Sequence, residues 1–238
     1  MFLRLVQKIC SLLLFLLGSR RLSGLENIPE SGPYLVVTNH MGAADIPLVY
    51  VAMPSDQIEN LSFFIGEKWE KPFFFGPLMR RAGGIYINRY RLDRKALRSA
   101  MEAIKAGAIF GLAPEGTRSR VGEMIEARDG AAYLASRTNV PILPIGLVNT
   151  DRAWPNLRRL RRTAFELHVG EPFELPDLGR RPKGKDLNAY TELIMVEIAA
   201  LIPARYHGFY KDSPALAARL RGEDPWPYCQ RNIAQADS

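Results

Sequence analysis

The chain has 238 residues, of which 47% are hydrophobic and 24% charged, with 19 glycines and 17 prolines. These values exclude an intrinsically disordered chain, a collagen and a multi-span membrane protein, and the length predicts one large domain with at most a small appendage. The two cysteines, Cys10 and Cys229, lie near opposite ends, so a disulfide scaffold and a cysteine zinc site are also excluded. The net charge of +7 is compatible with a nucleic acid, an anionic membrane or a phosphorylated substrate as the partner.

A short apolar run, residues 9–18 (ICSLLLFLLG), lies between basic side chains: Arg4, Lys8, Arg20 and Arg21. A membrane-spanning helix needs about 20 apolar residues, and this run is much shorter. It is also not followed by the small-residue cleavage site of a secretory signal. We therefore expect residues 1–22 to form an amphipathic and apolar helix in a membrane interface, with its cations near the headgroups. The alternatives are a helix packed on the domain's own core and a cleaved signal.

Apolar runs typical of strands then alternate with helical patterns along the chain. The predicted strands are 34–38, 61–66, 84–88, 108–113 and 141–148, with 165–169 as an edge strand. The predicted helices are 44–52, a short one ending near 79, 91–106, 127–138 and 186–201. This alternation predicts an α/β fold with a mostly parallel central sheet covered by helices on both faces. The last thirty residues or so, rich in Pro, Trp and Tyr, are expected to form irregular cover.

The first polar segment follows the predicted strand 34–38 directly. It reads Asn-His-Met-Gly-Ala-Ala-Asp over residues 39–45, so His40 and Asp45 are five positions apart. In a regular helix that separation turns two side chains about 140° apart, and they meet only if His40 stays in the loop while Asp45 starts the helix. A carboxylate bonded to one imidazole nitrogen leaves the other nitrogen as a general base. The alternative is a loop histidine beside a helix-capping aspartate.

Two further segments end predicted strands with a basic residue. In residues 114–119 (PEGTRS), backbone N–H groups and Thr117 can donate to an oxyanion, and the Arg118 guanidinium can bind two phosphate oxygens at once. Residues 83–89 (GGIYINR) end in Arg89, which can join Arg118 on one phosphate. Taken alone, each segment also fits an ordinary glycine-containing turn with a solvated arginine.

Together these segments resemble the glycerolipid acyltransferase superfamily, which includes the 1-acyl-sn-glycerol-3-phosphate acyltransferases. The family's Asn-His-x4-Asp block matches Asn39, His40 and Asp45, and its Gly-x-Ile-aromatic-Ile-x-Arg block matches residues 83–89. Its Pro-Glu-Gly-Thr-Arg-Ser block matches residues 114–119, and its Val-Pro-Ile-x-Pro-Val block matches residues 140–145. Four blocks in the family's order between residues 39 and 145 are much more specific than any one block.

The chain departs from the family's blocks at a few positions: Gly42 for a small polar residue, Ala113 for Phe, Tyr86 for Phe and Asn88 for Asp. None of these changes removes a reacting group, so they leave the reaction type unaffected and the acceptor preference open. The family often has a basic residue between its first two blocks, and Lys68 is the loosely aligned match. Lys68 fits an ordinary surface charge equally well.

The resemblance implies transfer of an acyl group from acyl-CoA or acyl carrier protein to the hydroxyl of a lysophospholipid. The first-choice acceptor is 1-acyl-sn-glycerol 3-phosphate, which gives phosphatidic acid. Asp45 is implied to orient His40 as general base, while Lys68 and backbone N–H groups near the first block stabilise the oxyanion. The residues implied to hold the substrate are Lys68, Arg89, Glu115, Gly116, Thr117 and Arg118. We expect no metal, no resident cofactor and no nucleophile that forms an acyl-enzyme.

These substrates imply a partner bilayer, with the protein peripheral or monotopic on the cytoplasmic face of the cell membrane. Residues 1–22 are then the attachment helix and residues 23–238 the acyltransferase domain. The alternatives are another acceptor (glycerol 3-phosphate, another lysophospholipid, a glycolipid or an aminolipid) and a non-catalytic lipid-binding protein. Nucleic acid is not expected as a partner, because no recognised motif is present. Residues 152–162 hold five arginines, a tryptophan and no acid, and fit a membrane contact or a solvated charge run.

Overall fold

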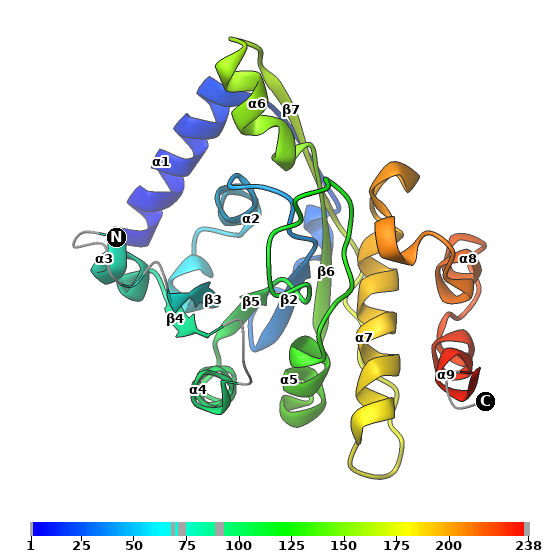
Figure 1. Ribbon diagram of the computed structural model, residues 1–238. Helices are drawn as coiled ribbons and strands as arrows, with labels where there is room; N and C mark the ends of the chain where they lie inside the picture. Colours follow the sequence, from blue (N-terminus) through cyan, green and yellow to red (C-terminus); the bar gives the residue numbers. More distant parts are fainter. Residues whose placement is uncertain (1, 68–69, 71–74, 89–92, 236–238) are drawn as a thin grey trace.

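The computed structural model describes residues 2–67, 70, 75–88 and 93–235, and these form an α/β fold around one sheet (Figure 1). The strands are β1 (Gly18–Ser23), β2 (Tyr34–Thr38), β3 (Leu61–Gly66), β4 (Gly84–Ile87), β5 (Ile109–Leu112), β6 (Ile142–Val148) and β7 (Thr163–Val169). Their order in the sheet is β1-β7-β6-β2-β5-β3-β4. Neighbouring strands are parallel except β6 and β7, which are antiparallel. The predicted α/β class with a mostly parallel sheet is confirmed.

Helices cover both faces of the sheet. They are α1 (Phe2–Leu17), α2 (Asp45–Ala52), α3 (Phe75–Arg81), α4 (Arg94–Lys105), α5 (Gly130–Thr138), α6 (Ala153–Arg158), α7 (Gly184–Ala199), α8 (Pro214–Leu220) and α9 (Trp226–Gln235). Helices α4, α5 and α7 pack on one face and α1 and α2 on the other, while α8 and α9 lie outside α7 (Figure 1).

The central strand β2 shows how the sequence builds these two layers. Successive side chains of a strand point to opposite faces. Accordingly, Leu35 and Val37 join the core beneath α4, α5 and α7, whereas Tyr34 and Val36 join the core beneath α1 and α2. All four side chains are fully buried. An apolar run without alternation is what a strand covered on both sides requires.

The edge of the sheet next to α1 differs from the prediction in two ways. Residues 18–22, expected to continue the N-terminal helix, instead form most of β1, so the predicted domain boundary at residue 22 falls inside a strand. Gly18 permits this junction because a Cβ there would lie 1.8 Å from the Thr163 carbonyl oxygen. The second difference is that β7, expected at the edge, lies between β1 and β6. It was misplaced because the pairing that covers it comes from a segment with no strand-like sequence.

The C-terminal segment is more regular than predicted, because it contains α8 and α9. Ser213 caps α8 by accepting a hydrogen bond from the Leu216 N–H at 3.3 Å, and Pro214 occupies the first turn. Trp226 of α9 stacks on Tyr190 of α7, with ring centroids 5.3 Å apart. The segment therefore covers the outer side of α7, which agrees with the expected role but not with the expected irregular structure.

Helix α1 packs on the domain through one face only. Leu3 and Leu14 are buried there, and the Gln7 amide donates to the carbonyl oxygens of Tyr50 (3.0 Å) and Met53 (2.8 Å) next to it. The opposite face is exposed and apolar, and includes Leu5, Ile9, Leu12 and Leu16. None of the described helices is both long enough and apolar enough to cross a membrane.

Candidate active site

The predicted site residues converge at the carboxyl ends of two neighbouring parallel strands. Residues 39–45 follow β2 and residues 113–119 follow β5, and these strands pair in parallel. Open α/β sheets place their sites at this edge, because the loops that leave adjacent strands meet there. Two hydrogen bonds join the loops directly: the Ser119 N–H donates to the His40 carbonyl at 2.8 Å, and the His40 N–H donates to Glu115 Oε1 at 2.9 Å.

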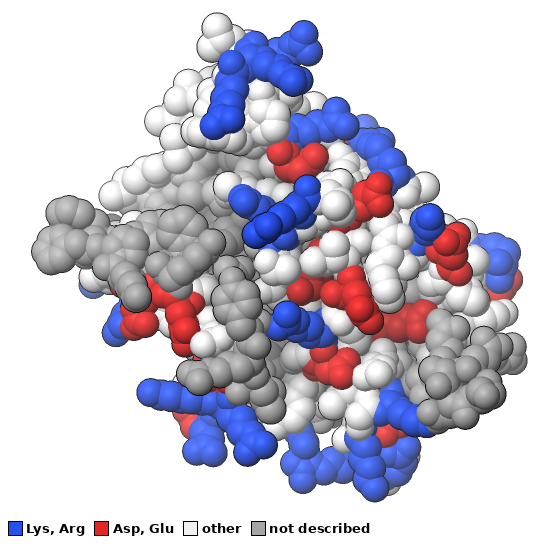
Figure 2. Space-filling model, viewed as in Figure 1, with Lys and Arg blue, Asp and Glu red and all other residues white. Residues whose placement is uncertain are grey.

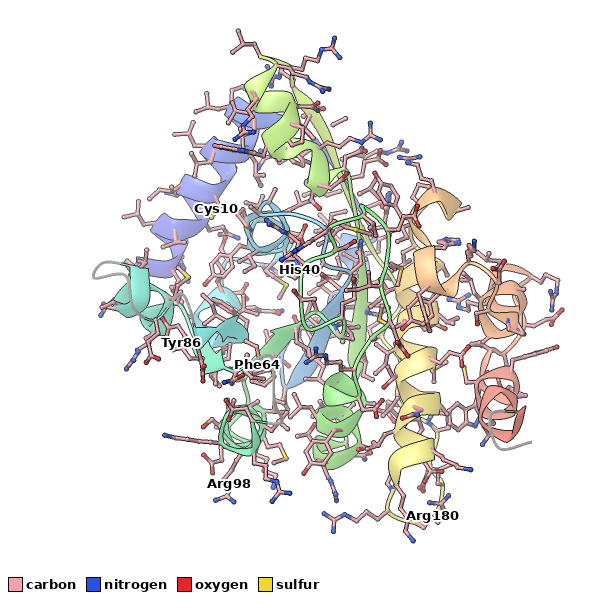
Figure 3. All side chains as sticks on the ribbon, in the orientation of Figure 1. Cys10, His40, Phe64, Tyr86, Arg98 and Arg180 are labelled. Carbon is pink, nitrogen blue, oxygen red and sulfur yellow. The ribbon has the colours of Figure 1, made fainter. Side chains whose placement is uncertain are left out.

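The His40 and Asp45 side chains are hydrogen-bonded, with Nδ1 and Oδ2 2.6 Å apart. His40 stays in the loop after β2, beside α2 (Figure 3), and Asp45 is the first residue of α2. This is the arrangement that the five-residue separation requires. Asp45 is buried, whereas a quarter of the His40 side chain is exposed. The imidazole can therefore be reached from outside while the carboxylate cannot.

The surroundings of Asp45 determine which imidazole nitrogen carries the proton. Besides His40, Oδ2 accepts the backbone N–H groups of Met41 and Gly42, each at 2.9 Å. Because two backbone N–H groups donate to Oδ2, this oxygen is an acceptor. His40 Nδ1 must then be the donor, so its proton lies between the two side chains. The second nitrogen, Nε2, is left with a lone pair and can act as a base.

Glu115 is buried between the two loops, with 1% of its surface exposed. Its Oε1 accepts the His40 N–H, and its Oε2 accepts the Ile125 N–H at 3.2 Å. Burial raises the pKa of Glu115 to about 7, and the hydrogen bonds from the His40 and Ile125 backbones only partly offset that effect. Both oxygens thus have partners within the protein. The sequence predicts that Glu115 contacts the acceptor, but this geometry favours a residue that positions His40.

Asn39 was noted in the sequence only as part of a motif, and the structure gives it a specific contact. Its amide donates to the Leu147 carbonyl at 2.9 Å and its carbonyl accepts the Leu147 N–H at 2.8 Å. This pair of bonds continues the pairing of β2 with β6 beyond the last residue of β2. Asn39 therefore fixes where the chain leaves the sheet, and with it the position of His40.

Gly42, one of the departures from the family pattern, is explained by close packing. A Cβ at this position would lie 2.1 Å from the Thr150 carbonyl oxygen. A small polar residue therefore does not fit without a shift of the backbone.

The residues expected to bind phosphate are placed differently from one another. Gly116 is half-buried, and Thr117 and Arg118 are exposed on the loop after β5. Arg118 forms no ion pair with any residue that the structure describes. Lys68 and Arg89 lie outside the described residues, so their predicted roles stay predictions.

The sequence predicts that backbone N–H groups near residues 39–45 stabilise the oxyanion, and the structure corrects this for three of them. The N–H groups of His40, Met41 and Gly42 already donate to the Glu115 and Asp45 carboxylates. They are therefore committed to holding the site together. Lys68 and other N–H groups of the block stay predicted oxyanion donors. Among the described residues, no three His, Cys, Asp or Glu side chains are grouped so that they could hold a metal ion.

The chain matches the family model for the acyltransferase domain over residues 19–148, which is more than half of its length. The chain belongs to this acyltransferase family. The matched region runs from β1 to the end of β6 and contains the dyad, the Glu115 loop and Asn39.

Relatives and a solved structure agree with this assignment. The chain is 32% identical over 138 residues to a chloroplastic 1-acyl-sn-glycerol-3-phosphate acyltransferase of Brassica napus, covering 56% of this chain and 38% of the relative. It is 22% identical to the enzyme of that name from Bacillus subtilis, covering 79% and 91%. The crystal structure of PlsC, the 1-acyl-sn-glycerophosphate acyltransferase of Thermotoga maritima, is 27% identical with a TM-score of 0.63, covering 81% and 76%. The chain spans about half the length, or less, of several curated relatives.

The raised pKa of Glu115 predicts a specific pH dependence of stability. Between pH 4.5 and about 7 the folded protein holds a proton on Glu115 that the unfolded chain has released, so the free energy of unfolding falls as pH rises. Glu115→Gln removes this titration. The difference in unfolding free energy, wild type minus variant, should fall by about 3 kcal/mol across that range in urea titrations. The exposed Glu123→Gln is the control, and parallel pH profiles for wild type and Glu115→Gln would contradict the prediction.

Proposed function

We propose that this protein transfers an acyl group from a thioester to the free hydroxyl of 1-acyl-sn-glycerol 3-phosphate, which yields phosphatidic acid. The observation that carries the proposal is the His40–Asp45 hydrogen bond beside the Glu115 loop in a chain of the acyltransferase family. Relatives and a solved structure named as acyltransferases for this acceptor support the choice of substrate. We propose acyl-CoA or acyl carrier protein as the donor.

The geometry supports direct transfer with His40 Nε2 as the general base. The acceptor hydroxyl oxygen attacks the thioester carbonyl carbon while Nε2 takes the hydroxyl proton. Asp45 then faces an imidazolium whose charge it stabilises through the bond at Nδ1. The tetrahedral intermediate breaks its C–S bond, and the leaving sulfur receives the proton from His40. The products are the new ester and the free thiol of the donor, and the imidazole is neutral again.

Arg118 is the described side chain that we propose for the acceptor phosphate. It is exposed on the loop that touches His40 through Ser119 and Glu115, and it is not paired with any carboxylate among the residues that the structure describes. A guanidinium can bind two phosphate oxygens with parallel hydrogen bonds. Thr117 adds a hydroxyl donor on the same loop. Arg89 and Lys68 are proposed for the same substrate from the sequence alone.

The acceptor and product are lipids, so we propose that the enzyme works at a membrane surface on the cytoplasmic face of the cell membrane. Helix α1 suits this task because its outward face is apolar while its inward face packs on the domain. Contiguous exposed apolar surface is unusual in a protein that lives only in water. The basic Arg4 and Lys8 are also exposed on this helix and can approach anionic headgroups.

His40→Ala should lower kcat by about 10²- to 10⁴-fold, because a positioned general base contributes roughly that much. Asp45→Asn should lower it as well, since an amide does not hold Nδ1 as the donor in the same way. The assay is release of thiol from acyl-CoA that depends on added lysophospholipid. His168→Ala is a matched control, because His168 has a similar exposed fraction but contacts Ser23 instead of the site. Near-normal kcat in His40→Ala would rule out the assigned base.

Arg118→Ala should raise the KM for the phosphorylated acceptor about 10- to 100-fold, with a smaller effect on kcat, because the phosphate contact exists before and during the reaction. Arg118→Lys should restore only part of the loss, since an ammonium does not reproduce the guanidinium fork. The control is Arg98→Ala on α4, an exposed arginine far from His40 (Figure 3). An unchanged KM in Arg118→Ala would favour an acceptor without phosphate.

The double variant Leu12→Ser/Leu16→Ser should weaken binding to anionic vesicles roughly tenfold or more, because each leucine buries several methylene groups in the bilayer. Both side chains are exposed, so the fold should persist. Activity on a short-chain, water-soluble acceptor should stay near normal, and this arm is the control. Equal co-sedimentation of wild type and variant with vesicles would show that α1 does not make the contact.

A further inference from the structure

Helix α6 and the turn after it, residues 153–162, carry exposed apolar side chains, as α1 does. Leu160 is 94% exposed and Trp154 is 60% exposed, and Leu157 is also open to solvent. We call this segment the α6 tip. In Figure 1 it lies at the top of the molecule, beside the end of α1. A leucine and a tryptophan that are exposed to this extent contribute little to the packing of the fold.

The backbone at Leu160 makes this exposure more informative. Leu160 has φ of +52°, the left-handed conformation that favours glycine or asparagine. The Leu160 N–H donates to the Leu157 carbonyl and the Arg161 N–H to the Asn156 carbonyl, the pattern of a helix C-cap that usually ends in glycine. The chain thus places a large apolar residue where the backbone disfavours it and where 94% of its surface is exposed. Strain of this kind points to a function.

The α6 tip is fixed against the C-terminal end of α1. The Arg162 guanidinium donates to the carbonyl oxygens of Phe15 and Gly18, each at 3.0 Å, and lies 5.6 Å from the Phe15 ring centroid. Immediately after the tip, Thr163 pairs with Gly18 in the sheet. The exposed apolar side chains of the tip therefore lie close to the last turn of α1, where Leu16 is exposed.

The charge of this region is of one sign. Residues 2–23 and 152–162 contain no Asp or Glu, and the tip exposes Arg158, Arg159 and Arg161 beside its apolar side chains. Figure 2 shows this group of basic side chains at the top of the molecule, over α6. Arg158 lies over the Trp154 ring, 5.3 Å from its centroid. Arginine and tryptophan around protruding leucines match the boundary between anionic headgroups and acyl chains.

We propose that the α6 tip is a second membrane-contacting element, which inserts Leu160 and Trp154 into the interface of an anionic bilayer next to α1. The proposal rests on the membrane association under the proposed function and adds a specific site to it. A lone helix lying on a bilayer leaves the domain free to roll about the helix axis. A second contact beside one end of α1 removes that freedom. It would thereby fix how far the candidate site, at the carboxyl ends of β2 and β5, lies above the lipid.

An acidic protein such as a carrier protein is the competing occupant for a cluster of arginines. The apolar side chains favour the bilayer, because arginines alone suffice for an acidic protein surface. A leucine held almost fully exposed in a disfavoured conformation gains most where acyl chains surround it on all sides. Continuity with the apolar face of α1 favours the bilayer as well.

The test is co-sedimentation of the full chain with vesicles of phosphatidylcholine mixed with phosphatidylglycerol, and with vesicles of phosphatidylcholine alone. Leu160→Asn should lower the partition coefficient about tenfold on both vesicle types. It should leave thermal stability unchanged or higher, because asparagine tolerates the left-handed conformation. Arg159→Gln/Arg161→Gln should lower binding by about fivefold per arginine, on the anionic vesicles only. The matched controls are Leu220→Asn on α8 and Lys95→Gln/Arg98→Gln on α4, all exposed in the structure.

Suppose that Leu160→Asn binds vesicles as strongly as the wild type, while Leu12→Ser/Leu16→Ser binds more weakly. This result would overturn the role of the tip and leave the proposed function intact. If the wild type binds neither of the two vesicle types, the membrane association itself is overturned. Weaker binding of the tip variants to acyl carrier protein without vesicles, and unchanged vesicle binding, would assign the tip to a protein partner. Normal thiol release with a water-soluble acceptor in every tip variant is expected, and its loss would show that the tip shapes the catalytic site.

Discussion

The carboxylate of Asp45 is the interaction on which the candidate site depends. One oxygen collects the Nδ1–H of His40 and the N–H groups of Met41 and Gly42, so a single buried charge closes the turn between β2 and α2. The same contacts keep His40 out of the helix and set its tautomer. All three donors lie within five residues of Asp45, which makes the geometry of the base a local property of this turn. The rest of the fold contributes by burying the Asp45 carboxylate.

Glu115 extends this arrangement from one loop to the next. Asp45 holds the ring of His40, and Glu115 holds its backbone N–H. Two carboxylates, one at the start of α2 and one on the loop after β5, thus fix one histidine from two directions. Asn39 adds a third support by tying the same loop to β6. The proposed base is therefore positioned by supports that are themselves packed and hydrogen-bonded, an arrangement that holds a side chain ready before substrate arrives. The raised pKa of Glu115 reflects the cost of placing its carboxylate where it can give this support.

The sequence predicted β2, β3, β5 and β6 because each is a mostly apolar run. It predicted the dyad because a strand–helix junction is the one place where His40 and Asp45 can meet. It did not predict β1, since residues 18–23 (GSRRLS) become a strand only through pairing with β7. With β1 missed, the alternating β7 looked like an edge. The role of Glu115 was also out of reach, because a motif does not show whether its carboxylate faces a ligand or a backbone. By contrast, Ser213 and Pro214 are ordinary helix-start signals, and α8 could have been inferred from them.

The distribution of polar groups on α1 connects the site to its proposed surroundings. Gln7 and Ser11 make contacts within the protein: Gln7 with carbonyl groups at the end of α2, and Ser11 with Arg20. Polar side chains of the helix thus bond to the domain, while the apolar side chains of Leu5, Ile9, Leu12 and Leu16 are exposed. In water this arrangement is unfavourable, because the exposed side chains gain nothing there. A lipid surface removes that disadvantage. Since α2, which begins at Asp45, packs directly on α1, the proposed lipid contact and the proposed base lie on two helices that touch each other.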